Sequence, residues 1–139
     1  MPEPFGFAVV GCGMIARFHV KAIKEIPAAR VAALVSRTPN NAQEVLKETG
    51  IPACPIFATI DDALKAPGED AVIITTPSGA HRDPALAAAA GGKHVVVEKP
   101  LEITGPRCQE IIDACERAGV RLCTIFPSRF GDANWALKK

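Results

Sequence analysis

The fold is decided by the stretch FAVVGCGMIARFHV, residues 7–20. Its first four residues are apolar and valine-rich, as in a buried strand, and Gly11, Gly13 and Ala16 then form a G-x-G-x-x-A pattern at the start of a helical segment. In such a turn Gly11 permits the sharp bend, Gly13 lets the backbone approach a pyrophosphate, and Ala16 lets the helix pack close to the strand. Free N–H groups at the helix N-terminus then hold phosphates. The stretch therefore predicts a dinucleotide-binding loop, with a glycine turn that serves packing alone as the alternative.

The residues between the glycines belong to the same predicted loop. The predicted cofactor-binding set at this point is Gly11, Cys12, Gly13, Met14 and Ile15. A thiol at Cys12 would be reactive only if exposed, and we interpret it as a spacer.

Apolar runs like the first one recur along the chain and alternate with segments of helical periodicity. The runs lie at residues 31–35, 71–75, 95–97 and 122–126. Short runs that are apolar on both faces suit strands covered by helices on both sides, and their alternation with helices predicts right-handed βαβ units. The expected fold class is α/β, a Rossmann-type doubly wound parallel sheet formed by residues 1–130, with residues 131–139 starting a further helix.

Three local expectations accompany this fold. In the first helix, one apolar face is expected to comprise Ile15, Phe18, Ala22 and Ile26. A short strand at 56–57 is followed by a short helix that Asp61 would cap. Cys108, Cys115 and Cys123 are interpreted as small core residues.

Composition limits the class of protein. The 139 residues suffice for one domain, and 48% hydrophobic with 22% charged residues is ordinary for a globular protein. A formal charge of +1 argues against bulk attraction to nucleic acid or to an acidic membrane surface. The sequence has no secretory signal, no apolar run near the ~20 residues of a membrane span, and no C-x-x-C spacing among its five cysteines. These features predict a cytoplasmic protein without a disulfide framework or a metal site.

The end of the second strand bears on the choice of cofactor. An NAD-preferring enzyme usually places a carboxylate there to bind the adenosine ribose, whereas this strand ends Val35-Ser36-Arg37-Thr38. The planar, permanently charged guanidinium of Arg37 can pair with a 2′-phosphate, and Ser36 can donate a hydroxyl. We therefore expect NADP in preference to NAD, which remains possible if Arg37 is merely a solvated loop residue.

A second group of candidate residues follows the fourth and fifth strands. The fourth is followed by Thr76-Pro77-Ser78, with His81 a helical turn later, and the fifth by Glu98-Lys99-Pro100. Since the carboxyl ends of parallel strands meet at one edge, both segments should border the same cleft as the glycine loop. Lys99 is the candidate catalytic residue, because an ammonium beside the positive nicotinamide ring can exchange a proton with a substrate hydroxyl. The alternative is a strand-end surface turn, and a cis Lys99–Pro100 peptide bond is a further hypothesis.

The histidines allow simpler interpretations. His19, on the first helix, is interpreted as a packing or surface residue, and His94 as a side chain on the sheet surface. For His81, a structural hydrogen bond and a contact to the ligand both remain open. No histidine or cysteine has the spacing of a metal site.

Taken together, the motifs resemble the amino-terminal domain of the Gfo/Idh/MocA oxidoreductases. The resemblance runs from about Phe5 to Arg129 and is carried by residues 11–16, Thr76-Pro77-Ser78 with His81, Gly92-Lys93-His94-Val95 and, above all, Glu98-Lys99-Pro100. It implies a two-domain enzyme that uses NAD or NADP to oxidise or reduce a carbinol of a sugar, cyclitol or related small molecule.

The resemblance also implies roles for individual residues. Lys99 would contact the reacting hydroxyl, Glu98 would help to hold the nicotinamide side, and Thr76, Pro77 and Ser78 would lie beside the cofactor. Arg129 would lie where the chain enters the cleft.

Beyond residue 130, the resemblance implies that the helix at 131–139 leads to a carboxyl-terminal substrate domain that carries a histidine acid/base and often the oligomer interface. The 139 residues alone are then expected to bind cofactor with little turnover. A nucleotide-sensing Rossmann module without catalysis, or a reductase of another Rossmann family, are the alternatives.

Overall fold

The apolar runs of the sequence become the strands of one parallel sheet. The computed structural model describes residues 2–138 and, over that range, contains a six-stranded sheet in the order β3-β2-β1-β4-β5-β6. The strands are β1 (Phe5–Val10), β2 (Ala29–Val35), β3 (Ile56–Phe57), β4 (Ala71–Ile74), β5 (His94–Val97) and β6 (Leu122–Thr124). All neighbouring pairs are parallel. The predicted Rossmann-type α/β fold is confirmed, and its strand order reverses between β1 and β4.

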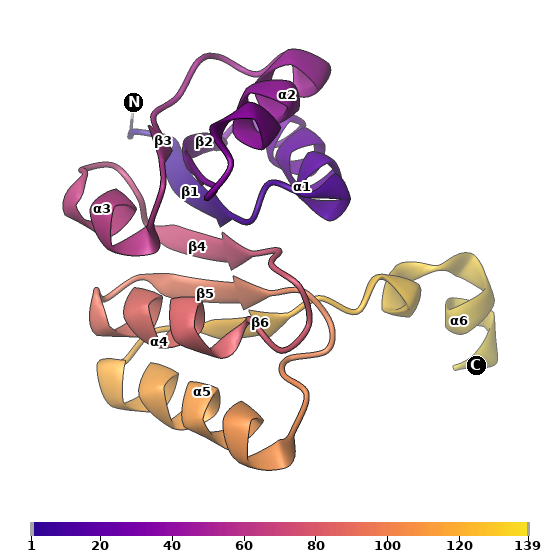
Figure 1. Ribbon diagram of the computed structural model, residues 1–139. Helices are drawn as coiled ribbons and strands as arrows, with labels where there is room; N and C mark the ends of the chain where they lie inside the picture. Colours follow the sequence, from indigo (N-terminus) through magenta and orange to yellow (C-terminus); the bar gives the residue numbers. More distant parts are fainter. Residues whose placement is uncertain (1, 139) are drawn as a thin grey trace.

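Helices cover both faces of this sheet (Figure 1). They are α1 (Met14–Lys24), α2 (Pro39–Thr49), α3 (Ile60–Lys65), α4 (Arg82–Ala90), α5 (Gly105–Ala118) and α6 (Asp132–Leu137), with a 3₁₀ turn η1 at Pro127–Phe130. On one face α1 and α2 pack on a core that includes Val9, Leu34 and Ile73. On the other, α3, α4 and α5 pack on a core that includes Ile74 and Ile111. Each central strand is thus buried on both sides, as its continuous apolar sequence predicted.

Glycines and threonines mark several helix ends, and the expected cap of α3 is corrected. Gly50 and Gly119 adopt the left-handed conformation directly after α2 and α5, and the Thr104 hydroxyl accepts the Arg107 N–H at the start of α5. At α3 the cap is Thr59, whose hydroxyl accepts the Asp62 N–H, and not Asp61. The helix begins two residues earlier than a cap at Asp61 would require, so Asp61 lies in its first turn.

The structure buries a different face of α1 from the predicted one. The buried residues are Ala16, Val20 and Ile23, whereas Ile15, Phe18 and Ile26 are 37–64% exposed and Ala22 is exposed as well. The close approach of Ala16, fully buried against the sheet, fixes the rotation of the helix about its axis. The residues four and seven positions after Ala16 then face the core, and the larger apolar side chains do not.

The last strand is shorter than predicted, because β6 ends at Thr124 and the chain then leaves the sheet. Figure 1 shows α6 standing away from the sheet, and neither η1 nor α6 contains a buried residue. Cys123, expected in the core, is exposed, since its side of this edge strand lacks a covering helix in the described part of the chain. Within residues 2–138, no helix combines the length and apolar character needed to cross a membrane.

Candidate cofactor site

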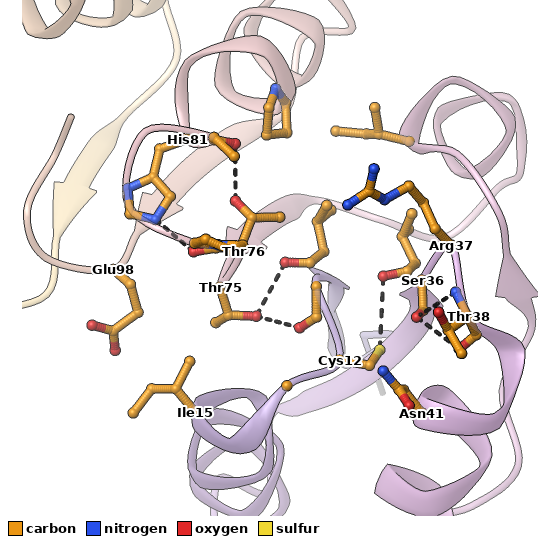
Figure 2. A pocket seen from close by; sticks show the side chains of 18 of the residues that line it. Cys12, Ile15, Ser36, Arg37, Thr38, Asn41, Thr75, Thr76, His81 and Glu98 are labelled. Carbon is orange, nitrogen blue, oxygen red and sulfur yellow. Dashed lines mark hydrogen bonds between the residues drawn. The ribbon is translucent and has the colours of Figure 1, made fainter. Parts of the chain in front are cut away.

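A cavity of about 770 Å³ lies at the carboxyl ends of the central strands. The residues that line it include the whole glycine loop, Val35 to Thr38 after β2, Thr75 to Ser78 after β4, and Glu98 and Lys99 after β5. Figure 2 shows Arg37 and Asn41 on one side of the cavity and Glu98 on the other, with the end of β4 between them. The cavity thus lies at the point where the strand order reverses, which is where open α/β sheets bind ligands.

The two glycines of the loop have different physical roles. Gly11 has a φ of +94°, and a Cβ there would lie 2.9 Å from the Thr76 backbone nitrogen. A Cβ on Gly13 would meet no atom within 4 Å, so the space beside it is open. Gly11 therefore permits the loop to pack against the end of β4, while Gly13 leaves room for a ligand to approach the N-terminus of α1.

Cys12 is a buried spacer, as the sequence indicated. Its thiol is 4% exposed and donates a hydrogen bond to the Val35 carbonyl oxygen, with 3.7 Å between sulfur and oxygen. The pKa of Cys12 is raised to about 11, chiefly by burial and also by Cys54, while Arg17 acts to lower it. The thiol is protonated at neutral pH and bridges the first two strands.

At the end of β2, Ser36 and Arg37 differ in whether their side chains are already hydrogen-bonded within the protein. The Ser36 hydroxyl donates to the Thr38 carbonyl oxygen at 2.9 Å and accepts the Thr38 N–H at 3.2 Å, so it is already occupied within its own turn. Arg37 is exposed at the cavity edge, and within residues 2–138 its guanidinium has no ion pair or hydrogen bond. Asn41, one turn into α2, also lines the cavity. Arg37, and not Ser36, is the free donor here.

His81 holds two loops together. It is 1% exposed, its Nδ1 lies 2.9 Å from the Pro100 carbonyl oxygen, and its Nε2 lies 2.8 Å from the Thr76 carbonyl oxygen. A neutral imidazole donates to one of these carbonyls at a time, and a doubly protonated ring donates to both. Although His81 lines the cavity, both ring nitrogens are directed at backbone, which favours the structural hydrogen bond over the contact to the ligand.

Glu98 and Lys99 complete the far side of the cavity. Glu98 is 8% exposed, and one carboxylate oxygen accepts the Lys99 N–H at 3.1 Å. The other lies 2.7 Å from His19 Nε2. Lys99 itself is exposed at the cavity, and its bond to Pro100 is cis, as hypothesised. The interpretation of His19 as a packing or surface residue missed this contact, although Ile15 and His19 lie four apart on the helix that begins at the cavity.

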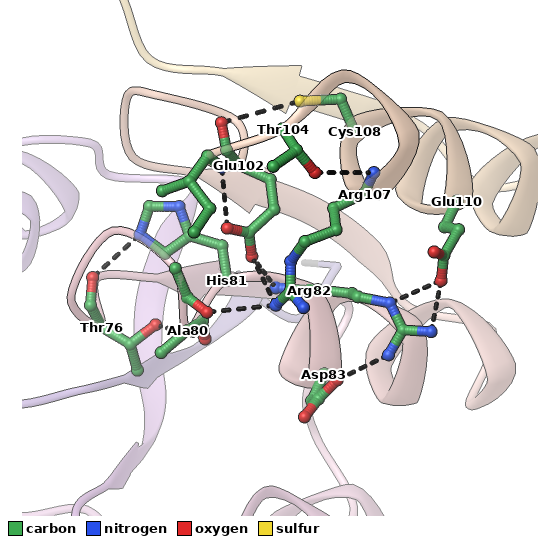
Figure 3. A network of polar contacts seen from close by, with 12 residues as sticks. Thr76, Ala80, His81, Arg82, Asp83, Glu102, Thr104, Arg107, Cys108 and Glu110 are labelled. Carbon is green, nitrogen blue, oxygen red and sulfur yellow. Dashed lines mark hydrogen bonds and ion pairs between the residues drawn. The ribbon is translucent and has the colours of Figure 1, made fainter.

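The loop after Lys99 is anchored to α4 and α5 by Glu102 (Figure 3). Its side chain is fully buried and accepts the backbone N–H groups of Ile103 and Arg82, at 2.8 and 2.9 Å, and the Arg107 guanidinium at 3.3 Å. Burial alone would raise the pKa of Glu102, but the Ile103 and Arg82 N–H groups, together with Arg107, lower it below its ordinary value. Sequence analysis did not identify Glu102, because its partners are 20 residues upstream at Arg82 and five residues downstream at Arg107.

Two further expectations concern this region. Arg129 lies in η1, is not among the residues that line the cavity, and has its guanidinium 5.8 Å from the centre of the Phe126 ring. In the part of the chain that the structure describes, no group of histidine, cysteine or carboxylate side chains is arranged to hold a metal ion.

Comparison with known proteins decides the family. Residues 5–126 match the Gfo/Idh/MocA family, described as "Oxidoreductase family, NAD-binding Rossmann fold". The chain belongs to this family. The matched residues are those of the family's NAD-binding Rossmann fold, which the glycine loop and the Glu98-Lys99-Pro100 segment indicated.

Similar proteins include sugar and cyclitol dehydrogenases. Inositol 2-dehydrogenases from Klebsiella pneumoniae subsp. pneumoniae and Ralstonia nicotianae are 33% and 34% identical over 133 residues, 94% of this chain. The WlbA dehydrogenase of Bordetella pertussis, solved with NADH and UDP-GlcNAcA, has a TM-score of 0.89 at 31% identity and covers 98% of this chain. The scyllo-inositol dehydrogenase of Lactobacillus casei, solved with NAD(H) and scyllo-inositol, has a TM-score of 0.87 at 27% identity, also over 98% of this chain.

The chain is shorter than these relatives. It spans 39% of the length of the two inositol 2-dehydrogenases, 41% of the WlbA chain and 40% of the scyllo-inositol dehydrogenase chain. The match covers the cofactor-binding fold described above.

Alanine at the two loop glycines should separate folding from binding. Gly11→Ala forces a side chain into a left-handed conformation against the Thr76 backbone, so we expect a loss of about 2 kcal/mol or more in the free energy of unfolding. Gly13→Ala should cost less than about 1 kcal/mol, as for a glycine N-cap, yet weaken NADH binding about tenfold or more by filling the open space. Urea denaturation and NADH fluorescence titration measure the two effects. Normal NADH affinity in Gly13→Ala would contradict this assignment.

Glu102→Gln should destabilise the chain in a pH-dependent way. The lowered pKa of Glu102 in the folded state means that its charged form contributes stability at neutral pH and loses it as the pH falls through the folded value. We expect a loss of about 1–3 kcal/mol at pH 7, shrinking as the pH falls below the ordinary glutamate value of about 4.3. Urea denaturation at several pH values measures it, and Glu116→Gln, at an exposed residue near the end of α5, is the control. A loss of stability that is the same at every pH would argue against this role.

Proposed function

We propose that this chain is the cofactor-binding part of an NAD(P)-dependent oxidoreductase that transfers a hydride between the nicotinamide and a carbinol of a sugar, cyclitol or related small molecule. The observation that carries the proposal is the position of Lys99, exposed in the cavity opposite Arg37, with the glycine loop between them. A cavity of about 770 Å³ falls within the range of small-molecule and cofactor sites.

The arrangement of the cavity suggests how an extended dinucleotide would lie. The pyrophosphate would meet the N-terminus of α1 beside Gly13, where a side chain is absent and the space is open. The adenosine half would extend toward Arg37 and Asn41 over β2, and the nicotinamide half toward Thr76, Pro77, Ser78 and Glu98 over β4 and β5. Met14, 75% exposed, and Ile15 at the cavity edge would cover the pyrophosphate from the side of α1.

The chemistry at Lys99 follows from its charge and exposure. The bound nicotinamide ring supplies the hydride acceptor or donor. The Lys99 ammonium can donate a hydrogen bond to the substrate oxygen and exchange a proton with it as the C–H bond is broken or formed. Glu98, buried and hydrogen-bonded to the Lys99 N–H, holds the backbone from which this ammonium projects.

The relatives suggest the substrate class and where the acid/base partner of Lys99 would lie. Proteins named as acting on inositol, and a structure that contains UDP-GlcNAcA, are similar to this chain over more than nine tenths of its length. We propose a polyhydroxylated substrate, bound partly by a carboxyl-terminal domain of the kind that would occupy the additional length of the relatives, with the acid/base partner of Lys99 and an oligomer interface on that domain. A sensor module would not require Lys99 at the nicotinamide end, which favours the enzyme.

We further propose that NADP is preferred to NAD. Within residues 2–138, the turn directly after β2 places no carboxylate in the cavity lining, whereas Arg37 lines the cavity and has a guanidinium without a hydrogen bond or ion pair. Since the Ser36 hydroxyl is occupied by its own turn, Arg37 is the main candidate to recognise a 2′-phosphate. The structures of relatives named above contain NADH or NAD(H), so this preference would distinguish the present chain from them.

Reversing the charge of Arg37 should reverse the preference. Arg37→Glu is expected to weaken NADPH binding between about tenfold and a hundredfold, by loss of a charge-assisted contact and by repulsion, while NADH affinity changes little or improves. Fluorescence titration of both cofactors measures this. Lys47→Glu, the same charge change at an exposed site near the other end of α2, is the control. Equal affinities for NADPH and NADH in the unmodified chain, unchanged in Arg37→Glu, would refute the NADP assignment.

Replacing Lys99 should separate binding from catalysis. Lys99→Met keeps most of the unbranched side chain and removes the ammonium, so we expect NADPH affinity within about threefold of the original and hydride transfer reduced by about 10²-fold or more. The first is measured on the 139-residue chain, for which we expect saturable binding and little turnover. The second is measured by cofactor absorbance with sugars and cyclitols, on protein that carries the proposed carboxyl-terminal domain. Undiminished turnover in Lys99→Met would refute the catalytic role.

A further inference from the structure

His19 forms a long-range contact that the cofactor-binding motifs do not account for. Its Nε2 lies 2.7 Å from Glu98 Oε1, although the two residues are 79 positions apart in the sequence. Both side chains are mostly buried, with 15% and 11% of their surfaces exposed. Hydrogen bonds to a charged group in such surroundings are among the stronger ones in proteins. The contact joins α1, which begins at the glycine loop, directly to the end of β5.

The Glu98 carboxylate is held at both oxygens. Oε1 faces His19, and Oε2 accepts the Lys99 N–H at 3.1 Å. Among residues 2–138, His19 is the only side chain that contacts this carboxylate by a hydrogen bond or ion pair. If that contact is lost, Glu98 is free to rotate about its side-chain bonds, and the hydrogen bond that orients the Lys99 backbone loses its fixed acceptor.

The two charged residues that flank His19 on α1 do not contact Glu98 in the described part of the chain. Arg17 is directed at α2, where it pairs with Glu44 and Glu48. Lys21 is exposed, and within residues 2–138 its ammonium forms no hydrogen bond or ion pair. On the cavity side, α1 therefore interacts with the loop after β5 through His19.

We propose that His19 is a positioning residue that donates a hydrogen bond to Glu98 and thereby fixes the nicotinamide end of the site relative to the glycine loop. The proposal rests on the function proposed above. It assigns to α1 two roles: its N-terminus meets the pyrophosphate, and its second turn holds the carboxylate beside Lys99. Because the two contacts share one rigid helix, the distance between the pyrophosphate and nicotinamide ends of the site is set by α1.

The test compares two ligands that differ at one end. ADP-ribose has the adenosine, pyrophosphate and second ribose of NADH but lacks the nicotinamide. In the 139-residue chain, His19→Ala should raise the Kd for NADH about tenfold, the effect of losing a hydrogen bond to a charged group, and leave the Kd for ADP-ribose within about twofold. If His19 served packing alone, its removal would shift α1 and the glycine loop, and the Kd values for both ligands would rise equally.

Two variants sharpen the comparison. His19→Gln places an amide N–H close to the position of the imidazole Nε2, so it should restore NADH affinity to within about threefold of the original. Lys21→Ala, at the exposed site two residues along the same helix, should change neither Kd. Thermal denaturation of each variant shows that the comparison is made on folded protein.

The outcomes distinguish this inference from the proposed function. A loss specific to NADH in His19→Ala, with recovery in His19→Gln, supports the positioning role. Equal weakening of both ligands, unchanged NADH affinity, or a His19→Gln variant no better than His19→Ala overturns it while the dinucleotide site stands. Failure of the unmodified chain to bind NADPH, NADH and ADP-ribose alike overturns the proposed function itself.

Discussion

The close contact between the glycine loop and the end of β4 is the constraint on which the rest of the site depends. Gly11 lies so near the Thr76 backbone that a Cβ could not fit, and Thr75 donates its hydroxyl to the Val10 carbonyl oxygen at 3.1 Å. This contact brings the loop to the point where the strand order reverses. It also sets the start of α1, so that Ala16 packs directly on the sheet and Gly13 faces open space.

The rest of the cavity wall is stabilised by buried side chains that form hydrogen bonds to the backbone of its loops. His81 lies between the carbonyl oxygens of Thr76 and Pro100, and Glu102 accepts the N–H groups of Arg82 and Ile103. These two buried side chains fix the loops that follow β4 and β5, so Lys99 projects from a segment that is hydrogen-bonded on both sides. The flexible Lys99 side chain is therefore attached to a rigid backbone segment. This reduces the conformational entropy that is lost when the side chain contacts a substrate.

The candidate site was predictable to the extent that it depends on local pattern. Glycines at a strand–helix junction, and polar residues at the carboxyl ends of apolar runs, are visible in the sequence, and the parallel topology requires them to meet at one edge. The hydrogen-bond partners of each polar side chain could not be predicted in the same way. The sequence suggested Ser36 as a donor to the cofactor, but its hydroxyl is hydrogen-bonded to Thr38 in its own turn.

By itself, the amino-acid sequence determined the order of strands and helices, the fold class and the segments that border the cavity, because these depend on short-range periodicity and on the chirality of βαβ connections. Only the tertiary structure decided which face of α1 is buried and that His19 meets Glu98. Helical periodicity shows that apolar positions recur but does not set the rotation of a helix against its sheet. A hydrogen bond across 79 residues leaves no local pattern, since it exists only when two distant strand and helix ends are brought together by the packing of the whole domain.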